Sequence, residues 1–255
     1  DAQDKGGSTS LCWAALHGHA ACAQLLVAAK ADLETKDRHG STALIWAARE
    51  GKTDCARLLL NAKAKILAQN NDGTTALIWA ALAGDKACVE LLLAAKADID
   101  TIDNDGYTAL MWAARKGHLE CARLLVDAKA QLDTKDAKHG KTALICAVEN
   151  GKTECTQLLV DARADLNTQD TQYGRTALIV AAREGNTDCL DMLIDAHANL
   201  EAKDTQLSFG FTALMWAAVK SNMECIQRLL AANADLEATD NEGNTAWQLA
   251  VREGN

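Results

Sequence analysis

The chain has 255 residues, of which 49% are hydrophobic, and it carries a formal net charge of -9 and no proline. This acidic balance argues against nonspecific binding to nucleic acids or anionic membranes, because both depend on dense positive charge. No apolar run approaches the roughly 18 residues of a membrane span, and residues 1–7 lack the apolar core of a signal peptide. We therefore expect a soluble intracellular protein, cytoplasmic or nuclear, that does not contact a membrane.

One segment recurs along the whole sequence with a turn glycine in each copy. Subtracting the numbers of successive turn glycines gives spacings of 33, 33, 33, 34, 34, 36 and 33 residues. A fixed period in this range indicates stacked repeats, each of which buries its apolar face only against its neighbours. We expect a single array over residues 1–255, with units that begin near Gly7, Gly40, Gly73, Gly106, Gly140, Gly174, Gly210 and Gly243.

Each unit predicts two short helices followed by a projecting hairpin. In the unit that begins at Gly40, Thr42 can cap a first helix that Gly51 interrupts, and a second helix begins near Thr53. An extended stretch then leads to a turn such as residues 104–106, Asn-Asp-Gly. The expected fold is an all-α repeat solenoid with projecting β-hairpin loops.

Cysteine and tryptophan each occupy a fixed position in the unit. Equivalent positions in stacked helix layers lie about 10 Å apart, whereas a disulfide needs Cα atoms within about 7 Å. We therefore expect buried reduced thiols at the cysteines that lie 15 residues after a turn glycine, which are Cys22, Cys55, Cys88, Cys121, Cys155, Cys189 and Cys225. We also expect apolar bulk in the stack from the tryptophans at the other position, Trp13, Trp46, Trp79, Trp112 and Trp216.

The repeated residues resemble the ankyrin repeat family, whose 33-residue unit opens with Gly-x-Thr-Pro-Leu-His-x-Ala-Ala. The resemblance covers about seven full repeats plus a terminal half repeat, and it implies a noncatalytic module that binds a protein through its hairpins and first helices. The matching threonines are Thr9, Thr42, Thr75, Thr108, Thr142, Thr176, Thr212 and Thr245, and the matching leucines are Leu11, Leu44, Leu77, Leu110, Leu144, Leu178 and Leu214.

The sequence departs from the family pattern at three positions. Alanine or serine replaces the proline in every unit, and isoleucine, methionine or cysteine replaces the histidine. The glycine that usually ends the second helix is replaced as well, and a cation at that place suits the helix dipole. The residues at this third position are Lys30, Lys63, Lys96, Lys129, Arg163, His197 and Asn233.

Motifs for catalysis, cofactors and metals do not emerge from the sequence. The glycines are spread singly rather than clustered as a phosphate loop requires, and the Cys/His pairs near Cys22 and Cys121 have no second pair in register. Six carboxylates share a place before the turn glycine of their unit, which suits turn formation: Asp37, Asp103, Asp136, Asp170, Asp204 and Asp240. We expect no enzymatic activity, no cofactor and no metal.

Residues that differ between repeats gather at the hairpin tips and at the ends of the first helices. Every Phe and Tyr lies at a tip, three hairpins are lengthened, and arginines and lysines end several first helices. Aromatic and arginine residues anchor protein interfaces, so we expect an acidic or phosphorylated protein segment as the partner. The candidate partner-binding residues are Arg49, Tyr107, Arg115, Lys116, Lys138, His139, Lys141, Tyr173, Arg175, Arg183, Phe209, Phe211 and Lys220.

Alternatives to this interpretation remain open at the level of sequence. Tyr107 and Phe211 can instead pack sideways on adjacent hairpins, and the basic residues can form an ordinary solvated face. Basic residues among aromatic ones also suit single-stranded nucleic acid, although the acidic chain counts against it. The leading hypothesis is a monomeric protein-interaction module such as an adaptor, and an enzyme with an unrecognised site is the weakest.

Overall fold

The computed structural model describes residues 1–205 and 209–254, and these form an all-α repeat solenoid of paired helices. The first helices of the repeats are α1 (Ser10–His17), α3 (Ala43–Arg49), α5 (Ala76–Ala83), α7 (Ala109–Lys116), α9 (Ala143–Glu149), α11 (Ala177–Glu184), α13 (Ala213–Val219) and α15 (Ala246–Glu253). The second helices are α2 (Ala20–Ala28), α4 (Thr53–Asn61), α6 (Lys86–Ala94), α8 (Leu119–Asp127), α10 (Thr153–Asp161), α12 (Thr187–Asp195) and α14 (Met223–Ala231). Within the described residues, none of these helices has the length and apolar character needed to cross a membrane.

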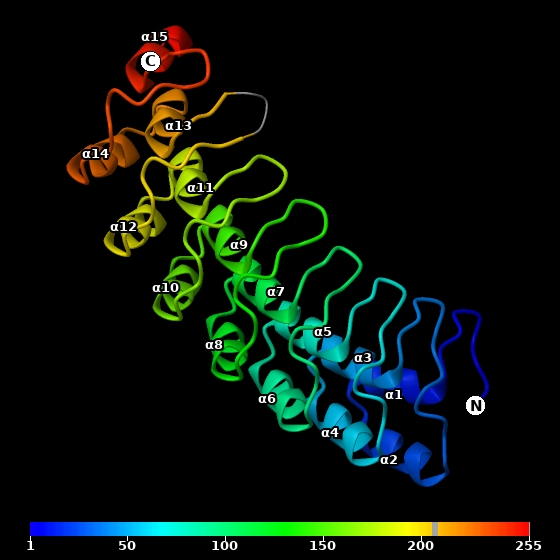
Figure 1. Ribbon diagram of the computed structural model, residues 1–255. Coiled ribbons are helices and arrows are strands. Elements are labelled where there is room, and N and C mark those ends of the chain that lie inside the picture. The colour runs from blue at the N-terminus through cyan, green and yellow to red at the C-terminus, as the bar shows by residue number, and fades with distance from the viewer. Residues whose placement is uncertain (206–208, 255) are drawn as a thin grey trace. The chain divides into compact units, whose positions relative to one another are not determined.

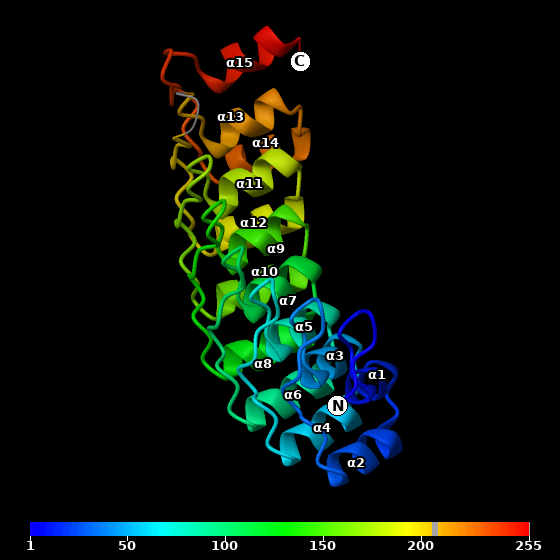
Figure 2. The same ribbon diagram turned by 90° about the vertical axis from the view of Figure 1, so that its right-hand side faces the viewer.

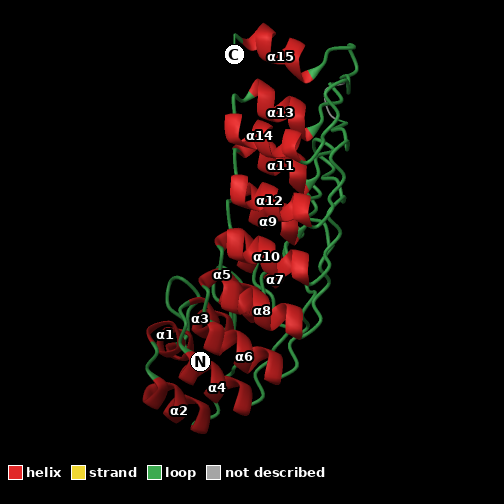
Figure 3. Ribbon diagram, turned by 90° about the vertical axis from the view of Figure 1, so that its left-hand side faces the viewer, coloured by secondary structure: helices red, strands yellow, loops and turns green. Residues whose placement is uncertain are grey.

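The chain divides into two compact units, which are described separately. Unit 1 comprises residues 1–113 and 120–130, and unit 2 comprises residues 114–119 and 131–255. In unit 1, α1, α3 and α5 pack in succession and so do α2, α4 and α6 (Figure 1). In unit 2, the successive contacts run through α9, α11, α13 and α15 and through α10, α12 and α14 (Figure 2). The long loops of unit 2 run together along one end of its helices (Figure 3).

Burial differs between the two helices of a repeat. In α3, Leu44, Ile45, Ala47 and Ala48 are all buried, because neighbouring helices cover the first helix on several sides. The α3 helix begins where the Thr42 hydroxyl accepts the backbone N–H of Ile45 at 3.5 Å, which satisfies one of the unpaired donors of the first turn. Leucine, isoleucine and alanine therefore form the core between the repeats.

The second helices end in a left-handed residue that is not glycine. In α4, the Lys63 N–H donates to the carbonyl of Leu60 and the Ala64 N–H donates to that of Leu59, a Schellman closure. Lys63 has a φ of +71°, a conformation that glycine adopts without a Cβ penalty. The six equivalent residues also have positive φ: Lys30, Lys96, Lys129, Arg163, His197 and Asn233. These residues thus occupy the position of the family's glycine and adopt the same left-handed conformation.

The prediction of buried reduced cysteines is confirmed for six of the seven repeat positions and is wrong for Cys22. Cys55 lies on α4 and its thiol is 3.8 Å from the Ala14 carbonyl of α1, so the side chain points at the preceding repeat. Cys22 is exposed, and it lies on α2, for which no preceding helix pair is described. Burial raises the pKa of the Cys88 thiol to about 12, which keeps it protonated and unreactive.

The tryptophans do not fill the stack as we expected. The Trp13 side chain is 46% exposed, and Trp46, Trp79, Trp112 and Trp216 are only half-buried. The next residues toward the core, such as Ile45 and Ala47, already occupy the space between repeats. The indole rings therefore lie on the side of the first helices that faces the loops.

The loops keep a hairpin geometry with little strand pairing. In the second repeat, the Asp37 N–H donates to the Ser41 carbonyl at 3.1 Å and the Gly40 N–H donates to the Asp37 carbonyl at 2.9 Å. Among the described residues, only two isolated bridges occur, between Gln3 and Thr9 and between Thr239 and Thr245. Loops that are tied at their tips in this way can present side chains from a rigid scaffold.

Candidate functional site

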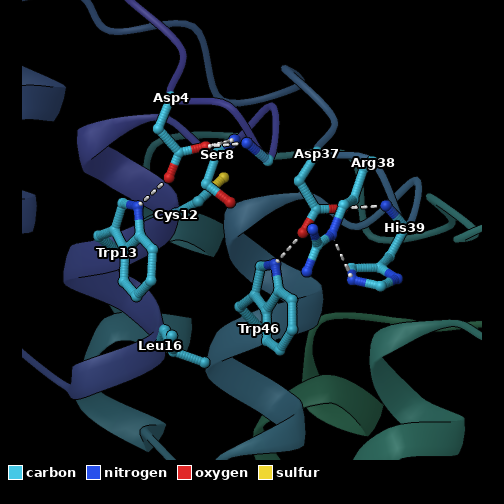
Figure 4. Close-up of a pocket in the computed structure, with 10 residues that line it drawn as sticks. Asp4, Ser8, Cys12, Trp13, Leu16, Asp37, Arg38, His39 and Trp46 are labelled. Carbon is cyan, nitrogen blue, oxygen red and sulfur yellow. Dashed lines mark hydrogen bonds between the residues drawn. The ribbon is translucent and has the colours of Figure 1, made fainter.

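In four repeats, the aspartate before the turn glycine links its loop to the first helix that follows. One oxygen of the Asp37 carboxylate accepts the N–H groups of His39 at 2.8 Å and Ser41 at 2.9 Å, which confirms the predicted turn role. The other oxygen accepts the indole N–H of Trp46 at 2.9 Å (Figure 4). The same indole bond joins Asp4 to Trp13, Asp103 to Trp112 and Asp204 to Trp216. Sequence reasoning missed this bond, although the nine-residue spacing from Asp to Trp in three repeats was visible.

The third repeat breaks this pattern because it carries Asn70 in place of aspartate. The Asn70 carbonyl oxygen accepts the N–H groups of Asp72 at 3.0 Å and Thr74 at 2.8 Å, so the turn is preserved. The remaining amide nitrogen is a donor and cannot accept a proton from an indole. The buried indole nitrogen of Trp79 accordingly has no hydrogen-bond partner in the described structure.

Backbone hydrogen bonds tie each loop tip to the next one in the same unit. In unit 1, the Asn71 N–H donates to the His39 carbonyl at 2.9 Å, and the Asn104 N–H donates to that of Asp72 at 2.9 Å. In unit 2, the carbonyls of His139, Tyr173 and Phe209 each accept an N–H from the following loop. These bonds fix the spacing of side chains along the loop row.

An arginine–aromatic cluster lies in unit 2 and consists of Tyr173, Arg175, Arg183 and Trp216. The Arg175 guanidinium lies 4.1 Å from the centre of the Tyr173 ring and 4.7 Å from that of Trp216, and Arg183 lies 5.6 Å from Trp216. Cations over aromatic faces are attracted by the ring quadrupole. Sequence reasoning selected the first three residues and missed Trp216, which it placed in the stack.

Both arginines of the cluster keep unused hydrogen-bonding capacity. The Nε atoms of Arg175 and Arg183 are buried and have no partner among the described residues, although Arg183 pairs with Glu184 through another nitrogen. Burial and, next, the positive charge of Arg183 lower the pKa of Arg175. An anion placed here would relieve the repulsion and supply the missing acceptors.

The remaining basic candidates of unit 2 differ in how much charge they can offer. Lys141 donates to both carboxylate oxygens of Glu149, at 2.7 and 2.8 Å, so its charge is already balanced. His139 is half-buried, and its N–H helps to form the turn at Asp136. Arg115 is half-buried, whereas the exposed lysines are Lys116, Lys138 and Lys220.

Two aromatic candidates lie beneath the surface, so packing within the array, which the sequence left open, is what the structure shows for them. Tyr107 is 7% exposed and its ring centre lies 4.8 Å from that of Trp112. Phe211 is 4% exposed and packs 5.3 Å from Trp216, with Phe209 half-buried against it at 5.2 Å. The residue that follows the turn glycine turns inward because the next indole offers an apolar surface.

In unit 1, the candidate Arg49 lies among tryptophan rings. The Arg49 guanidinium lies between two rings of consecutive repeats, 4.9 Å from Trp46 and 4.7 Å from Trp79, and its Nε lies 3.5 Å from a Glu50 oxygen. Tryptophans also line two open pockets in this unit. Trp13 and Trp46 line one pocket, and Trp79 and Trp112 line the other. The described residues contain no group of three or more His, Cys, Asp or Glu side chains placed to hold a metal ion.

The repeat architecture has direct counterparts among known proteins. The family model described as "Ankyrin repeats (3 copies)" matches residues 1–70, 62–136, 130–204 and 201–255. The chain belongs to the ankyrin repeat family. Among solved structures, this ankyrin repeat protein is similar to the human ASB11 ankyrin repeat domain, with a TM-score of 0.77 and 26% identity over 88% of this chain and 98% of that one.

A second solved relative supports the same assignment. The ankyrin repeat domain of Bcl-3, described as a unique member of the IkappaB protein family, aligns with a TM-score of 0.77 and 27% identity, over 89% of this chain and all of that chain (100%). The comparison with curated proteins found no match. Ankyrin repeats are generally noncatalytic protein-interaction modules, which is the class of function that the fold supports.

Proposed function

We propose that this ankyrin repeat protein binds an acidic or phosphorylated segment of a partner protein at the arginine–aromatic cluster of unit 2. The observation that carries the proposal is the pair of buried, unpartnered Nε atoms on Arg175 and Arg183. Each guanidinium can donate two parallel hydrogen bonds to a carboxylate or phosphate. The loop-and-helix face of unit 2 is therefore the binding face in this proposal.

Aromatic contacts prepare the cluster for this role. The rings of Tyr173 and Trp216 both contact the Arg175 guanidinium and hold it in place. Less side-chain freedom is then lost on binding, because the arginine is already ordered. Lys138 and Lys220 are exposed and add positive charge that attracts an anionic segment during encounter. Phe209 supplies adjacent apolar contact.

The cellular setting of the proposal follows from the thiols. Eight of the nine cysteines are buried, and all nine are free, which suits a reducing compartment such as the cytoplasm or nucleus. We further propose that the protein acts as a monomer. Sedimentation of the full chain alone and with ligand would test the monomeric state.

Fluorescence anisotropy with the full chain tests the anionic-segment proposal. The probe is a labelled Gly/Ser peptide that contains two glutamates and one phosphoserine, and the comparison probe has serine at all three positions. Replacing Arg175 and Arg183 by Gln should weaken binding of the anionic probe by at least about tenfold, because a charge-assisted hydrogen bond contributes roughly 1.5–3 kcal/mol.

The matched control combines Arg57→Gln and Arg123→Gln, because it removes the same two charges from exposed positions on α4 and α8 in unit 1. Equal losses in the control and the double variant would contradict a specific site, and so would equal binding of the uncharged probe. A labelled single-stranded oligouridylate serves as a further arm. Stronger binding of this RNA than of the peptide, sensitive to Trp216→Ala, would favour a nucleic-acid ligand instead.

A further inference from the structure

In unit 1, the space between the indole rings of consecutive repeats forms a series of slots. The middle slot lies between Trp46 and Trp79 and is occupied by the chain's own Arg49, whose guanidinium contacts both rings. Arg49 lies nine residues after the turn glycine of its repeat. Its position shows directly which chemical group fits between two such rings.

The slots before and after the middle one carry leucine at the position of Arg49. Leu16 lies nine residues after Gly7, and Leu82 lies nine residues after Gly73. A leucine side chain is shorter and leaves its slot open, so Leu16 lines a pocket of about 290 Å³ between Trp13 and Trp46 (Figure 4). Leu82 lines the corresponding pocket of about 310 Å³ between Trp79 and Trp112. We call these the first slot and the third slot.

Carboxylates surround both open slots. The first slot is lined by Asp4 and Asp37, together with Arg38, whose Nε donates to the ring of His39. The third slot is lined by the carboxylates of Asp72, Asp103 and Asp105, and the residues lining it include no cation. Aromatic walls with nearby negative charge favour a cationic guest, because the ring faces and the carboxylates both attract positive charge.

We propose that the first and third slots bind two arginine side chains of a basic segment in a partner protein. Arginine fits better than lysine because its planar guanidinium stacks on indole faces and still presents its edge to a carboxylate. This site is separate from the cluster of unit 2 and has the opposite charge preference.

The distance between the slots predicts the spacing of the two arginines. The slots are two repeats apart, which corresponds to about 20 Å at an interaxial spacing of roughly 10 Å. An extended segment advances roughly 3.3 Å per residue, so the two arginines should lie about six residues apart. A segment with arginines three residues apart would place the second one on the filled middle slot.

Anisotropy of a labelled 13-residue Gly/Ser peptide with two arginines six residues apart tests the proposal on the full chain. Citrulline at both arginine positions removes the charge but keeps the shape, and it should weaken binding at least about tenfold. Failure of the arginine peptide to bind, or equal binding of the citrulline peptide, would overturn the proposal.

Leu82→Arg provides a second test because the new side chain should fill the third slot from within, as Arg49 fills the middle one. Binding of the six-spaced peptide should fall at least about tenfold while the helical circular dichroism is retained. Leu67→Arg adds the same charge at an exposed loop position of unit 1 and should change binding less than about twofold. Equal losses in the two variants would show a general charge effect and refute the slot.

Arg49→Leu gives the reciprocal test because it should open the middle slot. The peptide with arginines three residues apart should then gain at least about fivefold in affinity, since neighbouring slots become available. No gain, in a variant that keeps its helical circular dichroism, would mean that the space between indole rings is not a guanidinium site. The unit 2 variants should not change binding of the arginine peptides. The anionic-segment proposal and the slot proposal can therefore fail independently of each other.

Discussion

Replacing Asn70 by Asp should stabilise the protein, because it supplies the acceptor that the Trp79 indole lacks. In the neighbouring repeat, Asp103 accepts the N–H groups of Asp105 at 3.0 Å and Tyr107 at 2.8 Å through one oxygen. Its second oxygen accepts the Trp112 indole N–H at 2.8 Å. Asn70 reproduces the first pair of bonds and omits the third.

The magnitude follows from a gain at the Trp79 indole and a cost of burying the new carboxylate. A buried donor without a partner costs about 1–3 kcal/mol, and a hydrogen bond to a charged acceptor contributes about 1.5–3 kcal/mol. Burying a new carboxylate offsets part of this gain, although three N–H donors would surround it. We expect Asn70→Asp to raise the free energy of unfolding by about 1 kcal/mol and Asp103→Asn to lower it by about 1–2 kcal/mol.

Urea denaturation followed by far-UV circular dichroism measures both changes. The midpoint should shift upward for Asn70→Asp and downward for Asp103→Asn, with an unchanged slope, because the surface exposed on unfolding is the same. The gain of Asn70→Asp should disappear in acid, where the introduced carboxyl is protonated. A neutral or destabilising Asn70→Asp at neutral pH would refute the assignment of the aspartate as the indole's acceptor.

Three further predictions concern the helix ends, an acidic turn and the thiols. Lys63→Gly should raise the urea midpoint by the equivalent of about 1 kcal/mol, because the Lys63 backbone is in the left-handed conformation that glycine adopts without strain. The control Lys65→Gly, at a neighbouring residue without positive φ, should not stabilise the chain. The N–H of Asn167 and the hydroxyl of Thr168 lower the pKa of Asp165 in the folded chain. The ionised Asp165 therefore stabilises the fold above its unfolded pKa of about 3.9, and this stabilisation is lost as the pH falls through the lower folded pKa. In Asp165→Asn, the thermal midpoint should therefore decrease less steeply below pH 4, because about one fewer proton is taken up on unfolding. An unchanged pH profile would contradict this. Iodoacetamide should alkylate only Cys22 in the native chain, because the other eight cysteines are buried, and all nine in urea, as counted by intact mass. Burial raises the pKa values of Cys88 and Cys155 to about 12 and 11, so rapid native labelling of either would be inconsistent with the packing.

The two proposed surfaces carry opposite charge, which the net charge of the chain does not reveal. The cluster around Arg175 and Arg183 carries unpartnered guanidinium nitrogens in unit 2, whereas carboxylates line the open slots beside Leu16 and Leu82 in unit 1. In both units, the indole rings lie on the same side of the first helices as the loops. The tryptophan at this repeat position therefore serves recognition in our proposals, and an aspartate bond holds it in place in every case except Trp79.

The sequence by itself determined the repeat, its helix pairs and its turn aspartates. These features follow from local chemistry within one 33-residue unit: a threonine that caps the first helix, apolar spacing that matches the helical period, and a turn glycine. Identical local signals in successive units demand the same structure, so the array is predictable without any long-range information. The candidate basic residues were also found this way, because they are the ones that differ between units.

Only the tertiary structure decided which way the aromatic side chains point. Trp46 faces the loops rather than the stack because Asp37 holds its indole, and Tyr107 turns inward because Trp112 offers it a surface. The open slots arise between residues about one repeat apart in sequence, such as Trp13 and Trp46, whose distance no local pattern specifies. Local preferences therefore build the scaffold, and contacts between repeats determine which side chains remain available for a partner.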